Sequence, residues 1–201
     1  ATVLKAAKAF VETQNIDVNT LEGVGVSATG QIDSRKGIVA GTCGNFPNYI
    51  NSPIQAELER LFGLPVTVAN DANCMTLGEV WVGGAKGYTD VIGVTLGTGV
   101  GGGIIINGQL YTGCNGIAGE IGHMVIRKDG EPCNCGRRGC LEAYCSAASL
   151  VRFAERALED GRKSVLAVHK GQLNAKQICD AVDAGDALAQ ELFDEYCGNL
   201  A

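Results

Sequence analysis

The sequence predicts a mixed α/β protein in which helices dominate the C-terminal end. Over residues 1–110, short apolar runs bounded by glycine or proline alternate with segments whose apolar residues recur at helical spacing. After residue 145 only the helical spacing is found. The chain of 201 residues is 46% hydrophobic and 19% charged, so it is globular rather than disordered and can bury a sizeable core.

Each element follows from its own local pattern. Asn107-Gly108, placed after a short apolar run, is typical of a tight hairpin. Ser52 and the pair Asn70-Asp71 are expected to cap the helices that follow them, and Trp81 is expected to pack in the core. The predicted strands are 24–27, 37–41, 65–69, 91–96 and 104–106. The predicted helices are 1–15, 53–62, 72–82, 145–158, 176–184 and 186 onward.

The charge and the cysteine content limit the function classes. A net charge of −6 argues against nucleic acid as the main partner, because nucleic acid is bound by a basic surface. ATP is not excluded, since it needs only local dipoles and a cation. No apolar run approaches the length of a membrane span, and no signal peptide is seen. The nine cysteines are therefore expected to be reduced, in a cytoplasmic protein without membrane contact.

One histidine and three cysteines lie within 18 residues, in the pattern H-x9-C-x-C-x4-C. Three thiolates and an imidazole are a zinc set, and four protein ligands leave no open position, so the predicted site is structural. Gly136 and Gly139 fit the tight turns that such a loop needs. The alternative is a group of ordinary free or disulfide-bonded cysteines, but the compact spacing favours zinc. The predicted ligands are His123, Cys133, Cys135 and Cys140.

Residues 97–103 contain five glycines. Gly97, Gly99 and Gly102 match G-x-G-x-x-G, but a strand rather than a helix is expected next, so a dinucleotide site is rejected. We interpret the segment as a hairpin turn whose bare amides, with the Thr98 hydroxyl, can contact phosphate oxygens. A turn without a ligand is the alternative. Phosphate contact is favoured because so many glycines are costly in chain entropy.

Asp71 follows a predicted buried strand and opens a predicted helix. A helix cap is sufficient reason for an aspartate at this position. However, ligands of α/β sheets bind at the carboxyl ends of the strands. A carboxylate there can orient a sugar hydroxyl and accept its proton as the hydroxyl attacks a phosphoryl group.

Four motifs occur in one order: Asn70-Asp71-Ala72-Asn73, the glycine turn 96–103, Gly119-Glu120-Ile121-Gly122-His123, and the cysteine loop 133–142. Together they resemble the ROK family (repressors, open reading frames, kinases), from about Gly23 to Ser149. The resemblance implies an actin-like, ribonuclease-H-like ATPase fold with two α/β domains and a zinc-stabilised loop. Residues 1–88 would belong to the N-terminal domain, with the catalytic aspartate. Residues 89–201 would belong to the C-terminal domain, with the phosphate turn and the zinc loop.

Kinases of this family phosphorylate hexoses from ATP with Mg²⁺. By resemblance, Asp71 is the catalytic base, and the structural Zn²⁺ has His123 as a ligand that also contacts the sugar. The residues that resemble sugar-binding positions are Gly30, Asn45, Asn70, Asp71, Glu120, His123 and Glu142. The residues that resemble ATP phosphate contacts are Gly97, Thr98, Gly99, Gly101 and Gly102.

The run 119–150 most resembles the glucokinase branch, so glucose is the expected hexose. N-acetylmannosamine and other hexoses stay open, as does a sugar-sensing repressor of the same family. The N-terminal Asp-x-Gly-Gly-Thr loop of the kinases, the helix-turn-helix of the repressors and the glycine-rich adenosine segment after Leu200 are not in this sequence. Helical patterns also run to both ends without an initiating Met. We therefore expect a fragment. The resemblance to the family implies that the whole protein is a homodimer or homotetramer.

Overall fold

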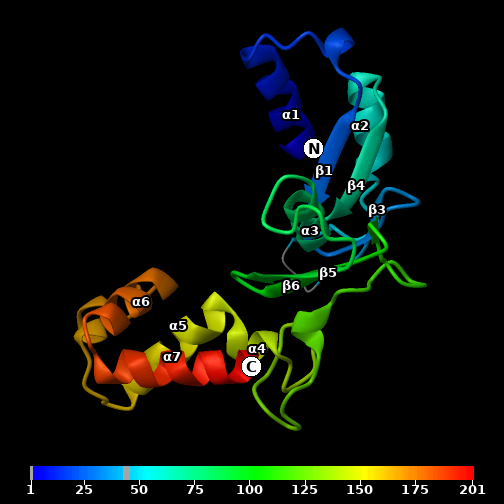
Figure 1. The fold of residues 1–201 in the computed structure, drawn as a ribbon. Coiled ribbons are helices and arrows are strands. Elements are labelled where there is room, and N and C mark those ends of the chain that lie inside the picture. Colours follow the sequence, from blue (N-terminus) through cyan, green and yellow to red (C-terminus); the bar gives the residue numbers. More distant parts are fainter. Residues whose placement is uncertain (1, 43–45) are drawn as a thin grey trace. The chain divides into compact units, whose positions relative to one another are not determined.

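The computed structural model describes residues 2–42 and 46–201, and it divides into two compact units (Figure 1). Unit 1 comprises Ala1–Gly93 and Gly103–Gly119, and unit 2 comprises Val94–Gly102 and Glu120–Ala201. Both units are discontinuous in sequence, because strands β5 (Val91–Leu96) and β6 (Val100–Ile106) contribute residues to each. The predicted division at residue 88 stays a prediction.

Unit 1 is built around two parallel strands, β1 (Val24–Ala28) and β4 (Val66–Asn70), in which Val24 pairs with Val66 (Figure 1). A second, antiparallel pair joins β2 (Gln31–Asp33) to β3 (Ile38–Gly41). Helices α1 (Thr2–Thr13) and α2 (Ile54–Phe62) cover this core, and the short 3-10 helix η1 (Val18–Thr20) follows α1. The buried core residues are Ala28, Ile32, Val39, Leu58, Val66 and Val68.

The third sheet has the order β5-β6-β7, where β7 is Gln109–Leu110. Asn107 and Gly108 connect β6 to β7 with φ angles of 52° and 74°, so the predicted hairpin is confirmed. β6 begins at Val100, four residues before the predicted start. The prediction was wrong there because glycines were taken as turn residues, whereas Gly101 to Gly103 lie in the strand.

Helix α3 (Asp71–Trp81) explains one of these glycines. A Cβ at Gly103 would lie 2.8 Å from the Cβ of the fully buried Thr76 and 3.2 Å from the carbonyl oxygen of Ala72. Any side chain at this position would push the helix away from the strand. Gly103 therefore serves close packing within unit 1, whether or not a phosphate binds nearby.

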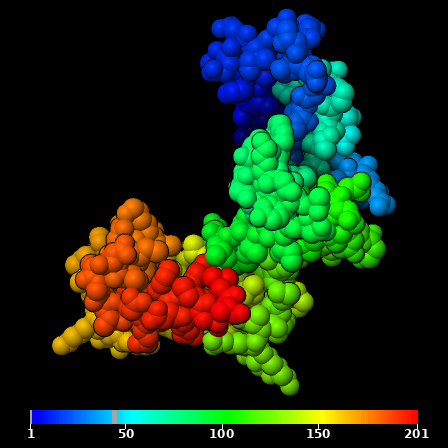
Figure 2. Space-filling model, viewed as in Figure 1, coloured from blue at the N-terminus to red at the C-terminus, as the bar shows by residue number. Residues whose placement is uncertain are grey.

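Unit 2 is largely helical. Its elements are η2 (Ile121–His123), α4 (Glu142–Cys145), α5 (Ala147–Glu159), η3 (Val165–His169), α6 (Ala175–Asp183) and α7 (Ala187–Leu200). Helices α5, α6 and α7 share a buried core that includes Leu150, Ile178 and Leu188, and α6 and α7 form one continuous surface in orange and red (Figure 2). In the described part of the chain, no helix combines the length and the apolar character needed to cross a membrane.

Two expectations about side chains were wrong. Pro53, not Ser52, occupies the N-cap position of α2, and the Ser52 hydroxyl donates instead to the carbonyl oxygen of Asn48 at 3.4 Å. Trp81 is 78% exposed at the end of α3, so it does not pack in the core of the described residues. Both misplacements arise from tertiary context, because a local pattern does not determine which face of a turn or helix end is covered.

Asp186 caps α7, and its side chain accepts a hydrogen bond from the Ala189 amide. Burial raises the pKa of Asp186, but hydrogen bonds from the amides of Ala189 and Val165 and from the Ser164 hydroxyl outweigh it and hold the pKa below its usual value. Asp186→Asn keeps an oxygen for the Ala189 amide but turns an NH2 group toward the Val165 amide, so it is expected to cost about 1 kcal/mol at pH 7, or about 2–4 °C in Tm. Thermal unfolding across pH measures it.

The sign of the pH dependence follows from the lowered pKa. The Asp186 carboxylate stabilises the fold above the pKa of the unfolded chain, and this stabilisation is lost as the pH falls through the lower folded-state pKa. The difference between wild type and Asp186→Asn should therefore shrink in acid. Asp183→Asn, on the exposed end of α6, is the control and should leave Tm unchanged. An equal Tm for wild type and Asp186→Asn at pH 7 would contradict the stabilising role of the carboxylate oxygen that faces Val165.

Candidate functional site

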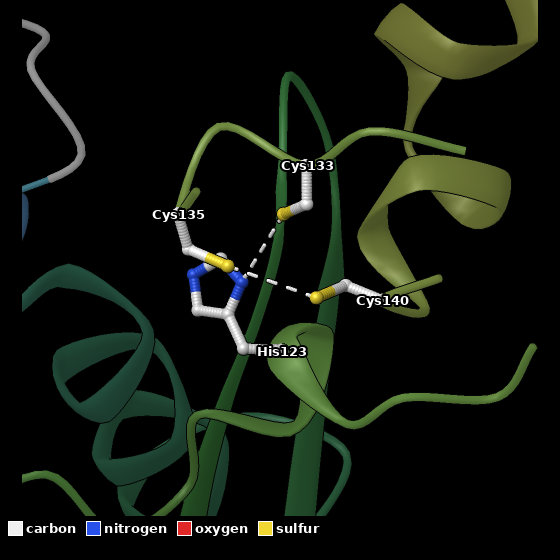
Figure 3. Close-up of side chains that lie close together, drawn as sticks. All are labelled: His123, Cys133, Cys135 and Cys140. Carbon is white, nitrogen blue, oxygen red and sulfur yellow. Dashed lines mark hydrogen bonds between the residues drawn. The ribbon is translucent and has the colours of Figure 1, made fainter. Parts of the chain in front are cut away.

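The four predicted zinc ligands converge in unit 2. The side chains of His123, Cys133, Cys135 and Cys140 point toward one another, and their ligand atoms all lie within 4.8 Å of one another (Figure 3). The Cys133 Sγ lies 3.6 Å from His123 Nδ1, and the Cys135 Sγ lies 3.7 Å from the Cys140 Sγ. Cys140 is buried and the other three are partly buried.

These distances fit a tetrahedral zinc ion. Zn–S bonds of about 2.3 Å at tetrahedral angles place two sulfur atoms about 3.8 Å apart. The separation of Cys135 and Cys140 is 3.7 Å. His123 presents Nδ1 to this cluster, so its Nε2 remains on the other side of the ring. The donor set of three thiolates and one imidazole therefore suits zinc in both chemistry and spacing.

The loop that carries the cysteines is held by its own backbone. Gly136 and Gly139 adopt φ angles of 85° and 78°, which favour glycine, and a Cβ at Gly139 would meet the Arg127 carbonyl oxygen. The buried Tyr144 closes the loop, since its hydroxyl accepts a hydrogen bond of 2.7 Å from the Glu131 amide. The ligands are thus brought together by turns and backbone contacts, as the spacing predicted.

Arg137 is a neighbour of the cluster whose role the sequence pattern did not show. Burial raises the pKa of Cys133 to about 12. Burial also raises the pKa of Cys135, but hydrogen bonds from the backbone and side chain of Arg137 outweigh this effect and lower the pKa to about 6. The Arg137 guanidinium also donates to the carbonyl oxygen of His123 at 3.0 Å. The position of Arg137 directly after Gly136 in the cysteine loop was the available sequence signal for this contact.

His123 also approaches Glu120, which is another predicted sugar contact. Its Nε2 lies 3.9 Å from the Glu120 Oε2, and Glu120 is the N-cap residue of η2. One ring nitrogen therefore faces the cysteines and the other faces a carboxylate. This arrangement is what a residue with two roles requires, because each nitrogen can serve a different partner.

Glu142 begins α4, two residues after the last cysteine ligand. Its Oε2 accepts a hydrogen bond of 3.0 Å from the Val100 amide, which belongs to the end of the glycine turn. The structure thus joins two of the predicted site segments that are 42 residues apart in sequence.

The glycine turn is narrower than predicted and spans Gly97 to Gly99. The Gly97 amide donates to the Gly99 carbonyl oxygen at 3.0 Å, and the Gly101 amide donates to the Thr95 hydroxyl at 3.1 Å. Within residues 2–42 and 46–201, the amides of Thr98 and Gly99 have no hydrogen-bond partner. These two amides lie at the tip of the turn, and Thr98 is exposed.

Asp71 lies in unit 1, at the junction of β4 and α3. Its Oδ1 accepts hydrogen bonds from the Asn70 side chain and from the Ala72 amide, both at 3.0 Å. The carboxylate is exposed, and no hydrogen bond to its Oδ2 is found among the described residues. Among the described residues, the hydrogen bonds therefore fix one oxygen of the carboxylate and leave the other without a partner.

Asn70 fixes this arrangement. Its Nδ2 donates to the carbonyl oxygen of Gly30 at 2.9 Å as well as to Asp71, and its Oδ1 accepts from the amides of Ala72 and Asn73. All of its usual hydrogen-bonding positions are thus in use. Gly30 has a φ of 89°, and a Cβ there would lie 2.7 Å from the Gly41 carbonyl oxygen. A direct sugar contact from Asn70 stays a prediction.

Tyr49 is a second neighbour that sequence reasoning missed. Burial raises the pKa of its phenol, and the negative charge of Asp71 raises it further. Its ring makes an edge-to-face contact with Phe46, with the centroids 5.4 Å apart. Asn45, predicted to face the sugar, lies outside the described residues. An aromatic pair in the loop after β3 was the available signal.

The predicted residues thus fall into two sets. Unit 1 holds Gly30, Asn70 and Asp71, joined by the hydrogen bonds of Asn70. Unit 2 holds the glycine turn, Glu120, Glu142 and the cysteine loop. The first set contains the predicted base, and the second contains the predicted phosphate turn and the four predicted zinc ligands.

Comparison with known proteins gives these sets a context. A profile described as ROK family matches residues 1–201. The glucokinase of Thermotoga maritima is 40% identical over 181 residues, covering 89% of this chain and 57% of that protein. The chain therefore spans about half the length of the curated relatives it matches.

Two solved structures share the fold. A ROK family transcriptional regulator, a homologue of the E. coli MLC protein, superposes with a TM-score of 0.84 at 28% identity, covering 99% of this chain and 50% of that one. A ROK family glucokinase from Streptomyces griseus, in complex with glucose and AMPPNP, gives 0.80 at 35% identity, covering 97% and 64%. The predicted α/β fold of actin-like ATPase type is confirmed.

Proposed function

Because this chain belongs to the ROK family, we propose that it is part of an ATP-dependent hexose kinase that converts glucose to glucose 6-phosphate. The observation that carries the proposal is the Asp71 carboxylate, exposed at the end of β4 with one oxygen fixed by Asn70. The similarity to glucokinases supports the same activity and favours glucose among the hexoses.

The reaction needs a proton acceptor, and Asp71 Oδ2 is the group proposed for this role. A hexose hydroxyl hydrogen-bonded there loses its proton as its oxygen attacks the γ-phosphorus of ATP, and the bond to the ADP oxygen breaks. Asn70 holds the carboxylate in one orientation, so its contribution is to position the base. Glu120, His123 and Glu142 would orient the other sugar hydroxyls.

The phosphate side of the reaction belongs to the glycine turn. Amide donors and the Thr98 hydroxyl can bind ATP oxygens without bringing a side chain close. Mg²⁺, when bound with ATP, neutralises the charge that develops on the phosphates. The predicted nucleotide-side residues Gly97, Gly101 and Gly102 shape this turn and the strand that follows it.

We also propose that a structural Zn²⁺ is held by His123, Cys133, Cys135 and Cys140. The convergence of the four donor atoms within 4.8 Å supports this. Four protein ligands close the coordination shell, so the ion would hold the loop in place and take no part in the reaction. Its effect on the sugar would act through His123 and Glu142, which the loop orients.

The proposal is tested by the release of ADP by the whole protein, given ATP and Mg²⁺ with each sugar of a panel. The panel contains glucose, mannose, N-acetylglucosamine and N-acetylmannosamine. Glucose is expected to give the highest kcat/KM. If only N-acetylmannosamine is turned over, it is the substrate in place of glucose. If no sugar increases ADP release, the kinase proposal is rejected.

A sugar-sensing regulator of transcription is the second candidate. It is favoured by the similarity to a ROK family transcriptional regulator. The kinase is preferred because Asp71 and the glycine turn are both present with the geometry described above. Sugar-dependent thermal stabilisation without turnover would support the regulator.

The kinase proposal also includes a cytoplasmic homodimer or homotetramer. Light scattering of the whole protein tests the oligomeric state.

A further inference from the structure

Glu142 contacts the glycine turn more closely than a sugar ligand needs to. Its Oε2 accepts the Val100 amide at 3.0 Å, and a Cβ at Gly99 would meet the same oxygen. The absence of a side chain at Gly99 is therefore what allows the carboxylate to lie against the turn. Both residues belong to unit 2.

The surroundings of Glu142 hold the turn from two further sides. The Ala147 amide, at the start of α5, donates to the Gly97 carbonyl oxygen at 2.8 Å. A Cβ at Gly122, in η2, would meet the Val100 carbonyl oxygen, so this backbone also approaches the turn closely. Segments before and after the cysteine loop thus contact Gly97, where the turn begins, and Val100, which follows it.

The hydrogen bonds of the turn divide its amides into two groups. Those of Gly97, Val100 and Gly101 donate to acceptors within unit 2. Those of Thr98 and Gly99 have no partner among residues 2–42 and 46–201. The Glu142 carboxylate therefore fixes the backbone at the end of the turn by accepting the Val100 amide. The amides of Thr98 and Gly99, at the tip, remain available to another ligand.

We propose that Glu142 is a positioning residue for the phosphate turn: by holding the Val100 amide, it keeps the backbone in the shape that presents the Thr98 and Gly99 amides to the phosphate oxygens of ATP. The proposal rests on the proposed function and adds a second role for a residue expected to contact the sugar. Because Glu142 follows Cys140 by two residues, the same carboxylate links the cysteine loop to the phosphate side of the reaction.

Two substitutions separate this role from a sugar contact. Glu142→Ala removes the acceptor, whereas Glu142→Gln keeps an oxygen that can accept the Val100 amide. Gly99→Ala leaves the carboxylate intact but forces it off the turn. Glu159→Ala, at the exposed end of α5, is the matched control. Hydrogen exchange of the segment 94–103, measured by mass spectrometry on the whole protein, reports the turn directly.

Exchange of that segment is expected to be about tenfold faster in Glu142→Ala and in Gly99→Ala, because the hydrogen bond from the Val100 amide is lost. Glu142→Gln should restore most of the protection. In turnover assays, KM for ATP should rise about tenfold in Glu142→Ala and return toward wild type in Glu142→Gln, since the turn depends on the acceptor rather than the charge. Glu159→Ala should match wild type in both assays.

Unchanged exchange in Glu142→Ala would overturn the positioning role, whatever the activity. A rise in KM for glucose alone, equal in the Ala and Gln variants, would reduce Glu142 to a sugar contact. If wild type has no kinase activity, the exchange experiment still decides the role of Glu142, and calorimetry with Mg²⁺-ATP decides the ligand of the turn. Equal ATP affinity in wild type and Gly99→Ala would then reject Thr98 and Gly99 as its receivers.

Discussion

Asp71→Asn is expected to lower kcat by about 10²–10⁴-fold, because the proton of the attacking hydroxyl loses its acceptor. The asparagine keeps an oxygen at Oδ1, which can still accept the hydrogen bonds from Asn70 and Ala72. Glucose affinity should therefore stay within about threefold of wild type, since the lost group acts mainly in the transition state. Steady-state kinetics and glucose calorimetry measure the two effects separately.

The control for this variant is Asp17→Asn, an exposed aspartate of unit 1 that caps η1. It should leave kcat and KM unchanged. Asp71→Asn with nearly full turnover would remove Asp71 as the base. A loss of glucose binding as large as the loss of turnover would instead make Asp71 a substrate ligand only.

Cys135→Ser is expected to have the largest effect on the cysteine loop. A hydroxyl is a poor zinc ligand, so the zinc affinity should fall by more than the about 10–100-fold that loss of an outer partner costs. The loop would lose its order, and with it the orientation of His123 and Glu142. Metal analysis of the purified protein is expected to give one zinc per chain for wild type and much less for the variant.

Cys179→Ser, on the exposed surface of α6, is the matched control and should keep its zinc. Activity and thermal stability should follow the metal content in both variants. Full zinc occupancy in Cys135→Ser would refute the four-ligand cluster. An absence of zinc in wild type, with normal activity, would refute the structural role of the metal.

The parts of the site that the sequence predicted are local ones. His123 and the three cysteines lie within 18 residues, so their spacing alone restricts them to one small volume. The pair Asn70-Asp71 sits at a strand-to-helix junction that a buried apolar run and a helical pattern both indicate. In each case the chain between the functional residues is too short to allow other arrangements.

The parts that could not be predicted depend on tertiary contacts. The hydrogen bond between Glu142 and Val100 joins residues 42 positions apart, and no periodicity encodes it. The effect of Asp71 on Tyr49 likewise comes from the folding of a loop toward β4. Gly103 shows the same limit, because its need for glycine comes from Thr76 of a different element and not from the turn.

The central claim is tested most directly by the product that the whole protein forms from glucose, Mg²⁺ and ATP. Phosphorus NMR of the reaction should show glucose 6-phosphate appearing in step with ADP, and Asp71→Asn should abolish both signals within the same time. Formation of ADP without a sugar phosphate, or of equal glucose 6-phosphate by wild type and Asp71→Asn, would contradict the account.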